Sequence, residues 1–341
     1  MSRRTRASLR CSPPPGSRRT SLRRCRGQRR RPRAIRGGPA QDRGTWIAEW
    51  AVTPKATGCS WGRTGRVDSM YIFDRFYRNP AFSNGLVLAE SVVAAALGIG
   101  CGFLLFPAEA SLIGVFLVAF AQARTVELLL DRNRDEIWGG GGKADTANLR
   151  LTISLLVMFL AILGTYAAAT LLAPESKVLV LFERQIGGYG GHSITDVRFD
   201  DLEGVLGHNL IVLAACFLFS LLYRHGGMLL VLAWNASVWG VVFPYIARTA
   251  PDVADGGPVV YFLKSFACIF PHLLLEACGY VLVAMAGVFL SKGLQKYEIG
   301  SPRFNQVGLA VLRIVLLSVL FLGVASVVEA WVAPALIRRL F

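Results

Sequence analysis

Long, uninterrupted runs of apolar residues constrain the fold of this chain more than any other feature. The sequence is 53% hydrophobic over 341 residues, and several runs approach the roughly 20 residues that a helix needs to cross a bilayer. We therefore expect an all-α fold, a polytopic transmembrane helical bundle of six or seven spans. The expected spans are 86–106, 111–123, 151–172, 206–222, 228–246, 270–290 and 307–331.

Two short apolar segments leave the number of spans open. The run 111–123 continues into the amphipathic segment 124–131, and Pro107 ends the run before it, so we expect the first two runs to form a hairpin. If 111–123 is only interfacial, the count falls to six. Segment 258–269 is expected to be an interfacial or re-entrant helix that leads into Pro271, which we place in the first turn of the next span.

The excess positive charge is confined to the N-terminal segment. Residues 1–69 hold 18 of the 37 Lys and Arg residues but 3 of the 22 Asp and Glu residues, so they account for the net charge of +15. Such a segment is expected to be disordered unless bound, as a tail for nucleic acid or anionic lipid. Alternatively, Met70 is the true start of translation and the upstream residues are an artefact. The segment lacks the apolar core of a signal peptide.

These features divide the chain into three parts. Residues 1–69 are the Arg-rich leader, 70–150 a helical hairpin with a cytoplasmic loop over 124–150, and 151–341 the core transmembrane bundle. The loops on the side of Met70 carry more Lys and Arg than those on the other side, which places the start of the core in the cytoplasm by the positive-inside rule. The acidic loop 173–205 is then expected to lie outside.

Five strongly polar or ionisable side chains lie within or beside the apolar runs and form the candidate functional cluster. In hydrocarbon such side chains are costly unless partnered, so they usually face the interior of a bundle or a water-filled cavity. They can also simply bond one helix to the next and fix the register of the bundle. The five residues are Asn209, Asn235, His272, Glu276 and Glu329.

His272 and Glu276 are four residues apart and therefore share one face of a helix. They can form an ion pair that docks on a neighbouring helix, a proton relay or ion site, or part of a metal site that lacks obvious third and fourth ligands. We expect Glu276 to be held by His272 together with Asn209 or Asn235. We expect no metal ion and no cofactor.

Motifs of known catalytic chemistry are missing from the sequence. There is no His-Glu-x-x-His, no Gly-x-Gly-Asp, no Walker motif and no Gly-x-Gly-x-x-Gly. The seven Cys residues are scattered without a Cys-x-x-Cys and are typical of small core residues. We therefore expect that the protein is not an enzyme, and an intramembrane enzyme remains only as a further alternative.

Four stretches of the second half carry recognisable local patterns, namely Gly207-His208-Asn209, Leu232 to Gly240, Phe270-Pro271-His272 with Glu276, and Val328 to Pro334. These stretches resemble the stage II sporulation protein M family of integral membrane proteins. The family usually has glycine where this chain has Leu273, and threonine where it has Ala333. The resemblance implies a polytopic protein of the plasma (inner) membrane, and in endospore formers the named member acts with peptidoglycan-cleaving partners without known catalysis of its own.

Two classes of function fit these observations. A scaffold or assembly component would hold membrane or envelope proteins, or further copies of itself, in the lipid bilayer through loop 173–205 and its helix faces, with no nucleic acid bound to the core. A transporter or channel would carry a small solute or ion along a path lined by the polar cluster. A transporter needs this cluster to converge on a cavity that reaches one face, whereas a scaffold can hold it paired in a packed core.

Overall fold

The structure is a computed structural model that describes residues 80–138, 143–187, 202–249 and 257–340. The chain divides into the units Met1–Gly65 and Arg66–Phe341, and every described residue belongs to the second unit. All regular elements among the described residues are helices, which confirms the expected all-α class. The predictions for the leader and for Met70 fall on residues outside the described ranges.

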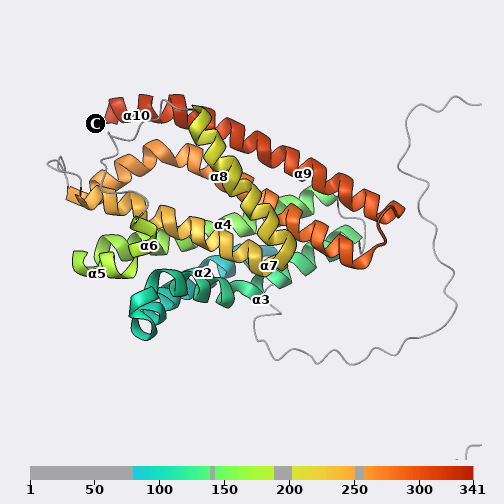
Figure 1. The fold of residues 1–341 in the computed structure, drawn as a ribbon, viewed down its shortest axis with the longest axis horizontal. Coiled ribbons are helices and arrows are strands. Elements are labelled where there is room, and N and C mark those ends of the chain that lie inside the picture. The colour runs from blue at the N-terminus through green and yellow to red at the C-terminus, as the bar shows by residue number, and fades with distance from the viewer. Residues whose placement is uncertain (1–79, 139–142, 188–201, 250–256, 341) are drawn as a thin grey trace, which may run out of the picture. The chain divides into compact units, whose positions relative to one another are not determined.

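Six helical segments of the described chain are long and apolar enough to cross a membrane, in agreement with the expected six or seven spans. α8 forms the centre of the bundle, since 72% of its most apolar window is buried, against 17% for the last segment. Figure 1 labels the elements. In chain order they are α2 (Pro80–Leu105), a 3-10 turn (Pro107–Glu109), α3 (Ala110–Trp138), α4 (Ala144–Leu172), α5 (Glu175–Leu181), α6 (Glu183–Ile186), α7 (Leu202–Thr249), α8 (Gly257–Lys296), α9 (Pro302–Val327), a π-helical turn (Val328–Val332) and α10 (Ala333–Leu340).

α7 consists of two arms that meet at Arg224, whose backbone is not helical (φ 55°, ψ −135°). The chain reverses there. This is shown by the close packing of Gly227 against the carbonyl group of Phe219 on the other side of the break. Each arm has more than 20 residues, enough to cross a bilayer alone. The two arms correspond to the separately predicted spans 206–222 and 228–246, so the described helices provide seven arms of crossing length.

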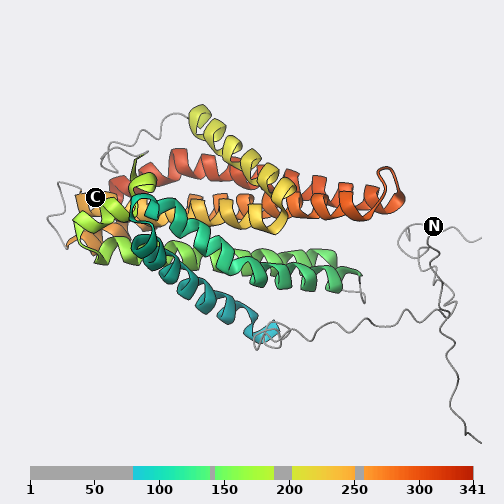
Figure 2. The same ribbon diagram turned by 60° about the horizontal axis from the view of Figure 1, so that its bottom comes forward.

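The ends of these arms gather at two opposite ends of the bundle. One end, which we call the turn end, holds the C-terminus of α3, the N-terminus of α4 and the break at Arg224. It also holds the α8–α9 turn, where Gly300 has a φ of +87°. The opposite end, which we call the cap end, holds α5, α6 and α10. Figure 2 shows the α8–α9 turn and the C-terminus at opposite ends of the helical unit.

Close backbone contacts hold neighbouring helices together, as expected for small residues in a membrane bundle. In the α2–α3 hairpin, a Cβ atom on Gly98 would lie 2.8 Å from the carbonyl oxygen of Gly114. A Cβ atom on Gly102 would lie 3.0 Å from the carbonyl oxygen of Ala110. The predicted hairpin of the first two runs is therefore present, and α3 is a long helix rather than a short interfacial one.

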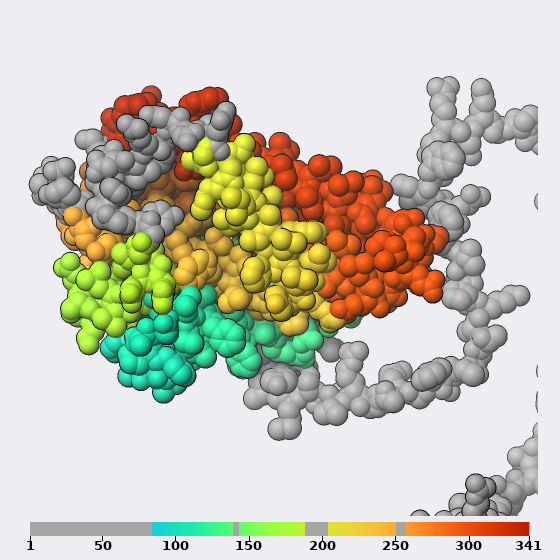
Figure 3. Space-filling model, viewed as in Figure 1, coloured from blue at the N-terminus to red at the C-terminus, as the bar shows by residue number. Residues whose placement is uncertain are grey.

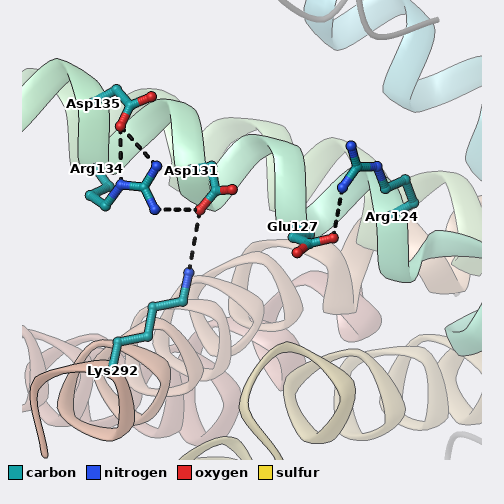
Figure 4. A network of polar contacts seen from close by, with 6 residues as sticks. All are labelled: Arg124, Glu127, Asp131, Arg134, Asp135 and Lys292. Atoms are coloured by element: carbon teal, nitrogen blue, oxygen red, sulfur yellow. Dashed lines mark hydrogen bonds and ion pairs between the residues drawn. The ribbon is translucent and has the colours of Figure 1, made fainter. Parts of the chain in front are cut away.

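The charged segment from Arg124 onward was expected to be a loop, and this expectation was wrong. Residues up to Trp138 continue α3, and α4 begins at Ala144. Oppositely charged side chains three or four residues apart favour a helix, and this segment contains several such pairs, two of them drawn in Figure 4. The pairs are Arg124–Glu127, Asp131–Arg134 and Arg132–Glu136.

Pro271 was expected in the first turn of a span, and this placement was also wrong. α8 begins at Gly257 and continues through Pro271 without a break. Proline has no backbone N–H, so the carbonyl of Ala267 loses its usual helical donor at this point. Membrane helices tolerate such prolines because their surroundings can satisfy the freed group. The segment 258–269 is therefore the first part of a central helix.

Candidate functional site

The polar cluster centres on a hydrogen bond between α7 and α8. Asn209 Nδ2 donates to Glu276 Oε1 at 2.6 Å. Both side chains are buried, with 8% of Asn209 and 5% of Glu276 exposed. A carboxyl group in this position needs a partner to offset the loss of hydration. The predicted pairing of Glu276 with Asn209 is therefore present.

A third side chain, Tyr280, extends this hydrogen bond into a chain. Its hydroxyl group donates to Asn209 Oδ1 at 3.3 Å, so the amide is held on both sides. The ring of Tyr280 packs near Trp239, with the ring centroids 6.2 Å apart. Sequence reasoning missed Tyr280, although it follows Glu276 by one helical turn and thus shares its face.

His272 does not take the role predicted for it. Its side chain is 5% exposed, and its Nδ1 atom has no hydrogen-bond partner among the described residues. Glu276 therefore relies on Asn209 and not on the histidine of the preceding turn. A buried polar atom without a partner is unusual and costly in a folded protein, so His272 is a second point of interest within the cluster.

Asn235 lies outside the cluster. Its Nδ2 atom donates to the carbonyl oxygen of Val231 in its own helix at 2.8 Å. Its neighbour Ser237 bonds to the carbonyl oxygen of Trp234 at 2.8 Å and accepts from Gln185 at 3.4 Å. Asn209 or Asn235 was predicted to hold Glu276, and of these two only Asn209 bonds to it. Asn235 satisfies its amide on the preceding turn of its own helix.

Glu329 lies in the π-helical turn Val328–Val332, where α9 passes into α10. The turn packs against α8, and the Glu329 carboxyl group is close enough to interact electrostatically with Glu276. The wider turn also accommodates Pro334, because Ala333 bonds to the carbonyl of Val328, five residues earlier. The structure thus brings Asn209, His272, Glu276 and Glu329 to one region of α8.

Two small cavities of the described helices lie away from this cluster. One is near the cap end, with Tyr166 and Phe182 in its wall, and the other is near the turn end, with Asn133 and Arg150 in its wall. Within the described part of the chain, no three His, Cys, Asp or Glu side chains gather as metal ligands would. Asn209, Glu276 and Tyr280 are buried and joined by hydrogen bonds, so these three residues form a packed element between α7 and α8.

The cap formed by α5 and α6 is fixed to the bundle at several points. Ser111 of α3 donates to the carbonyl oxygen of Leu181 at 3.0 Å, and Arg184 pairs with Glu109 at 3.2 Å. The ring of Phe182 is 1% exposed and packs on Tyr166 of α4. Figure 3 shows the cap, in lime green, as a continuous surface at one end of the helices. The first part of the predicted outer loop is therefore an ordered surface.

The long apolar helices, their exposed leucines and the buried polar pair define a polytopic α-helical integral membrane protein. Residues 152–334 match the sequence model of the family described as stage II sporulation protein M, which covers more than half of the chain. The chain therefore belongs to this family. No curated protein and no solved structure matches it.

Proposed function

We propose that this protein is a non-catalytic scaffold or assembly component of the plasma membrane that holds envelope-associated proteins at its cap end. The observation that carries this proposal is the packed state of the polar cluster. Glu276 is buried and held by Asn209, whose amide also accepts from Tyr280. A buried, paired network of this kind supports a role in fixing the register of the helices.

The cap supplies a surface on which a partner can dock. Leu179 and Val180 of α5 are 44% and 46% exposed, while Val178 between them and the bundle is buried. The charged side chains of Lys177 and Glu183 flank these residues and are exposed. Because the cap is fixed to α3, α4 and α7, binding there would not require the surface to become ordered first.

The orientation belongs to the same proposal. The turn end carries Arg132, Arg134, Arg150, Lys292 and Lys296, and the first residues of α2 start there. The positive-inside rule favours this end for the cytoplasm, which would place the cap outside. A partner in the cell envelope could then reach the cap directly.

Site-specific photo-crosslinking in native membranes tests the proposal. A photoreactive residue at Leu179 is expected to give a defined protein adduct, because Leu179 is exposed on the cap. The matched control is Leu149, which is 59% exposed at the turn end of α4. Adducts that are the same for both positions, or lipid adducts alone at Leu179, would contradict docking at the cap.

A second candidate function is a proton- or ion-coupled transporter. Two observations favour it: the unpartnered Nδ1 of buried His272, and the nearness of the Glu276 and Glu329 carboxyl groups. Flux in proteoliposomes of the purified protein separates the two candidates. A transporter would lose ion-driven flux on Glu276→Gln but not on Lys177→Gln at the surface, whereas a scaffold shows no flux in any variant.

A further inference from the structure

Arg313 is a cation on the most exposed span of the bundle, and sequence reasoning missed it. The side chain is exposed, and it makes no hydrogen bond or ion pair with any described residue. Exposed leucines surround it on α9, namely Leu309, Leu312, Leu316 and Leu317, which are 43% to 61% exposed. An isolated cation on such a face requires an anion or water to offset its cost in lipid.

Five basic residues of α3, α4 and α8 already have acidic partners. Figure 4 shows Arg124 with Glu127, and Asp131 between Arg134 and Lys292. Arg132 and Arg150 both pair with Glu136. These acidic residues all belong to α3, whereas α9 packs mainly on α8 and forms an outer edge in Figure 1. Arg313 is therefore remote from the acidic residues that pair with these five.

The depth of Arg313 can be read from the antiparallel packing of α8 and α9. Gly293 lies against Val307, and Gly279 lies against the carbonyl group of Ser318. Interpolation between these contacts puts Arg313 level with Met285 and Ala286, which are fully buried on the inner helix. At 1.5 Å per residue, this level is about 10 Å further from the turn end than Lys292.

The direction of α9 lets the guanidinium group reach back toward the turn end. Cβ atoms in a helix point toward its N-terminus, and α9 starts at the turn end, so the long side chain of Arg313 starts in that direction. It passes over Leu309 and the small residue Ala310, with exposed Gln306 two turns before it on the same face. Arginine stems commonly lie along apolar surface in this way while the charged head reaches the interface.

We propose that Arg313 binds the phosphate of an anionic phospholipid in the leaflet at the turn end, with the acyl chains against the leucines of α9. The planar guanidinium group suits a phosphate because it can donate two parallel hydrogen bonds. Gln306 is placed to donate a further hydrogen bond from the same face. The site does not depend on the scaffold function or on the cap.

The test uses the purified full-length protein in nanodiscs of phosphatidylcholine alone, or with phosphatidylglycerol as the anionic probe. Phosphatidylglycerol is expected to raise the thermal midpoint of the wild-type protein and to be retained as bound lipid in native mass spectrometry. Arg313→Gln should lose at least half of both effects, and Arg313→Lys should keep part of them. Arg303→Gln, on a different face of the first turn of α9, and Arg338→Gln, at the cap end, should keep them.

The phosphatidylcholine sample controls for folding, since an exposed side chain without protein partners should not alter the midpoint there. An unchanged response of Arg313→Gln to phosphatidylglycerol would overturn the site, as expected if a carboxylate of another membrane protein is the true partner. Equal losses for all three arginines would also overturn it, because they would indicate general charge attraction. If Arg313→Gln does not fold, the amount of phosphatidylglycerol retained by Arg313→Lys is compared with the amount retained by Arg303→Lys. Less retained lipid on Arg313→Lys supports the site, and equal amounts overturn it.

Discussion

Gly240 of α7 and Leu163 of α4 bring their helices so close that a Cβ atom on Gly240 would lie 2.5 Å from the Leu163 carbonyl oxygen. The same Cβ would lie 2.8 Å from Cβ of Tyr166. Backbone atoms cannot move aside as the end of a flexible side chain can. The helices must therefore separate if any side chain is added at position 240.

We expect Gly240→Ala to destabilise the protein by about 1–3 kcal/mol, the usual cost of overpacking a close contact. Gly164→Ala on the neighbouring helix is the matched control, because a Cβ atom there meets nothing within 4 Å. The control should be neutral or slightly stabilising, since alanine favours a helix more than glycine does. Thermal midpoints in one detergent measure both. Equal midpoints for the two variants would refute the close contact.

Substitution of Glu276 separates the hydrogen bond from the charge. Glu276→Gln keeps an oxygen that can accept from Asn209, so we expect folding and abundance close to those of the wild type. Glu276→Leu leaves the buried Asn209 amide without its acceptor, which costs about 1–3 kcal/mol. Membrane-fraction yield and thermal midpoint measure the difference. A leucine variant as stable as the glutamine variant would mean that the network adds nothing to the bundle.

Much of the fold follows from the length of the apolar runs, because lipid leaves a chain few alternatives to helices. The ends of the helices do not follow. Residues Arg124 to Trp138 were expected to be a loop because they are highly charged. Their oppositely charged pairs, Arg124–Glu127, Asp131–Arg134 and Arg132–Glu136, have the spacing that stabilises a helix. The reversal at Arg224 is implied by the two predicted spans on either side of it, but its positive φ could not be deduced from the residue type.

The site was predicted only in part, for reasons that concern individual side chains. Glu276 and Asn209 were paired correctly because each is costly to bury alone. Asn235 was left as the alternative partner, since residue type alone does not show that its amide bonds to its own helix backbone. Tyr280 was overlooked because a tyrosine in an apolar run is ordinarily a packing residue, and only the helix contacts reveal its hydroxyl as a donor to Asn209.

The orientation can be tested with cysteines at exposed ends of the described helices. In a background without the seven native cysteines, Gly187→Cys near the cap should react with an impermeant maleimide added outside intact cells. Lys143→Cys at the turn end should react only after the membrane is permeabilised. Both positions are exposed, so reactivity reports on the side of the membrane. The reverse pattern would invert the topology and place the cap in the cytoplasm.

The ion pair between Lys292 and Asp131 joins α8 to α3 at 3.8 Å, but we expect it to contribute little. Both side chains are more than a third exposed, and partly exposed pairs of this length are worth about 0–1 kcal/mol. Asp131 also keeps Arg134 when Lys292 is removed. Lys292→Met should therefore leave the thermal midpoint nearly unchanged at both low and high salt. A large, salt-dependent fall in the thermal midpoint would show that this pair holds α3 and α8 together.

Tyr280 and Glu276 act on the same amide, so their substitutions should not be additive. Tyr280→Phe removes a 3.3 Å hydrogen bond to Asn209 and should cost about 0.5–1.5 kcal/mol. Once Glu276→Leu has released the other side of the amide, Asn209 can turn, and the tyrosine hydroxyl no longer has a fixed acceptor. We therefore expect a coupling free energy of about 0.5–1 kcal/mol in the double-mutant cycle, measured from unfolding in mixed micelles. Tyr261→Phe, at a buried tyrosine of α8 about five turns earlier, should show no coupling to Glu276→Leu. Additive costs for Tyr280 and Glu276 would mean that Asn209 is held by its surroundings and not by the two side chains that it joins.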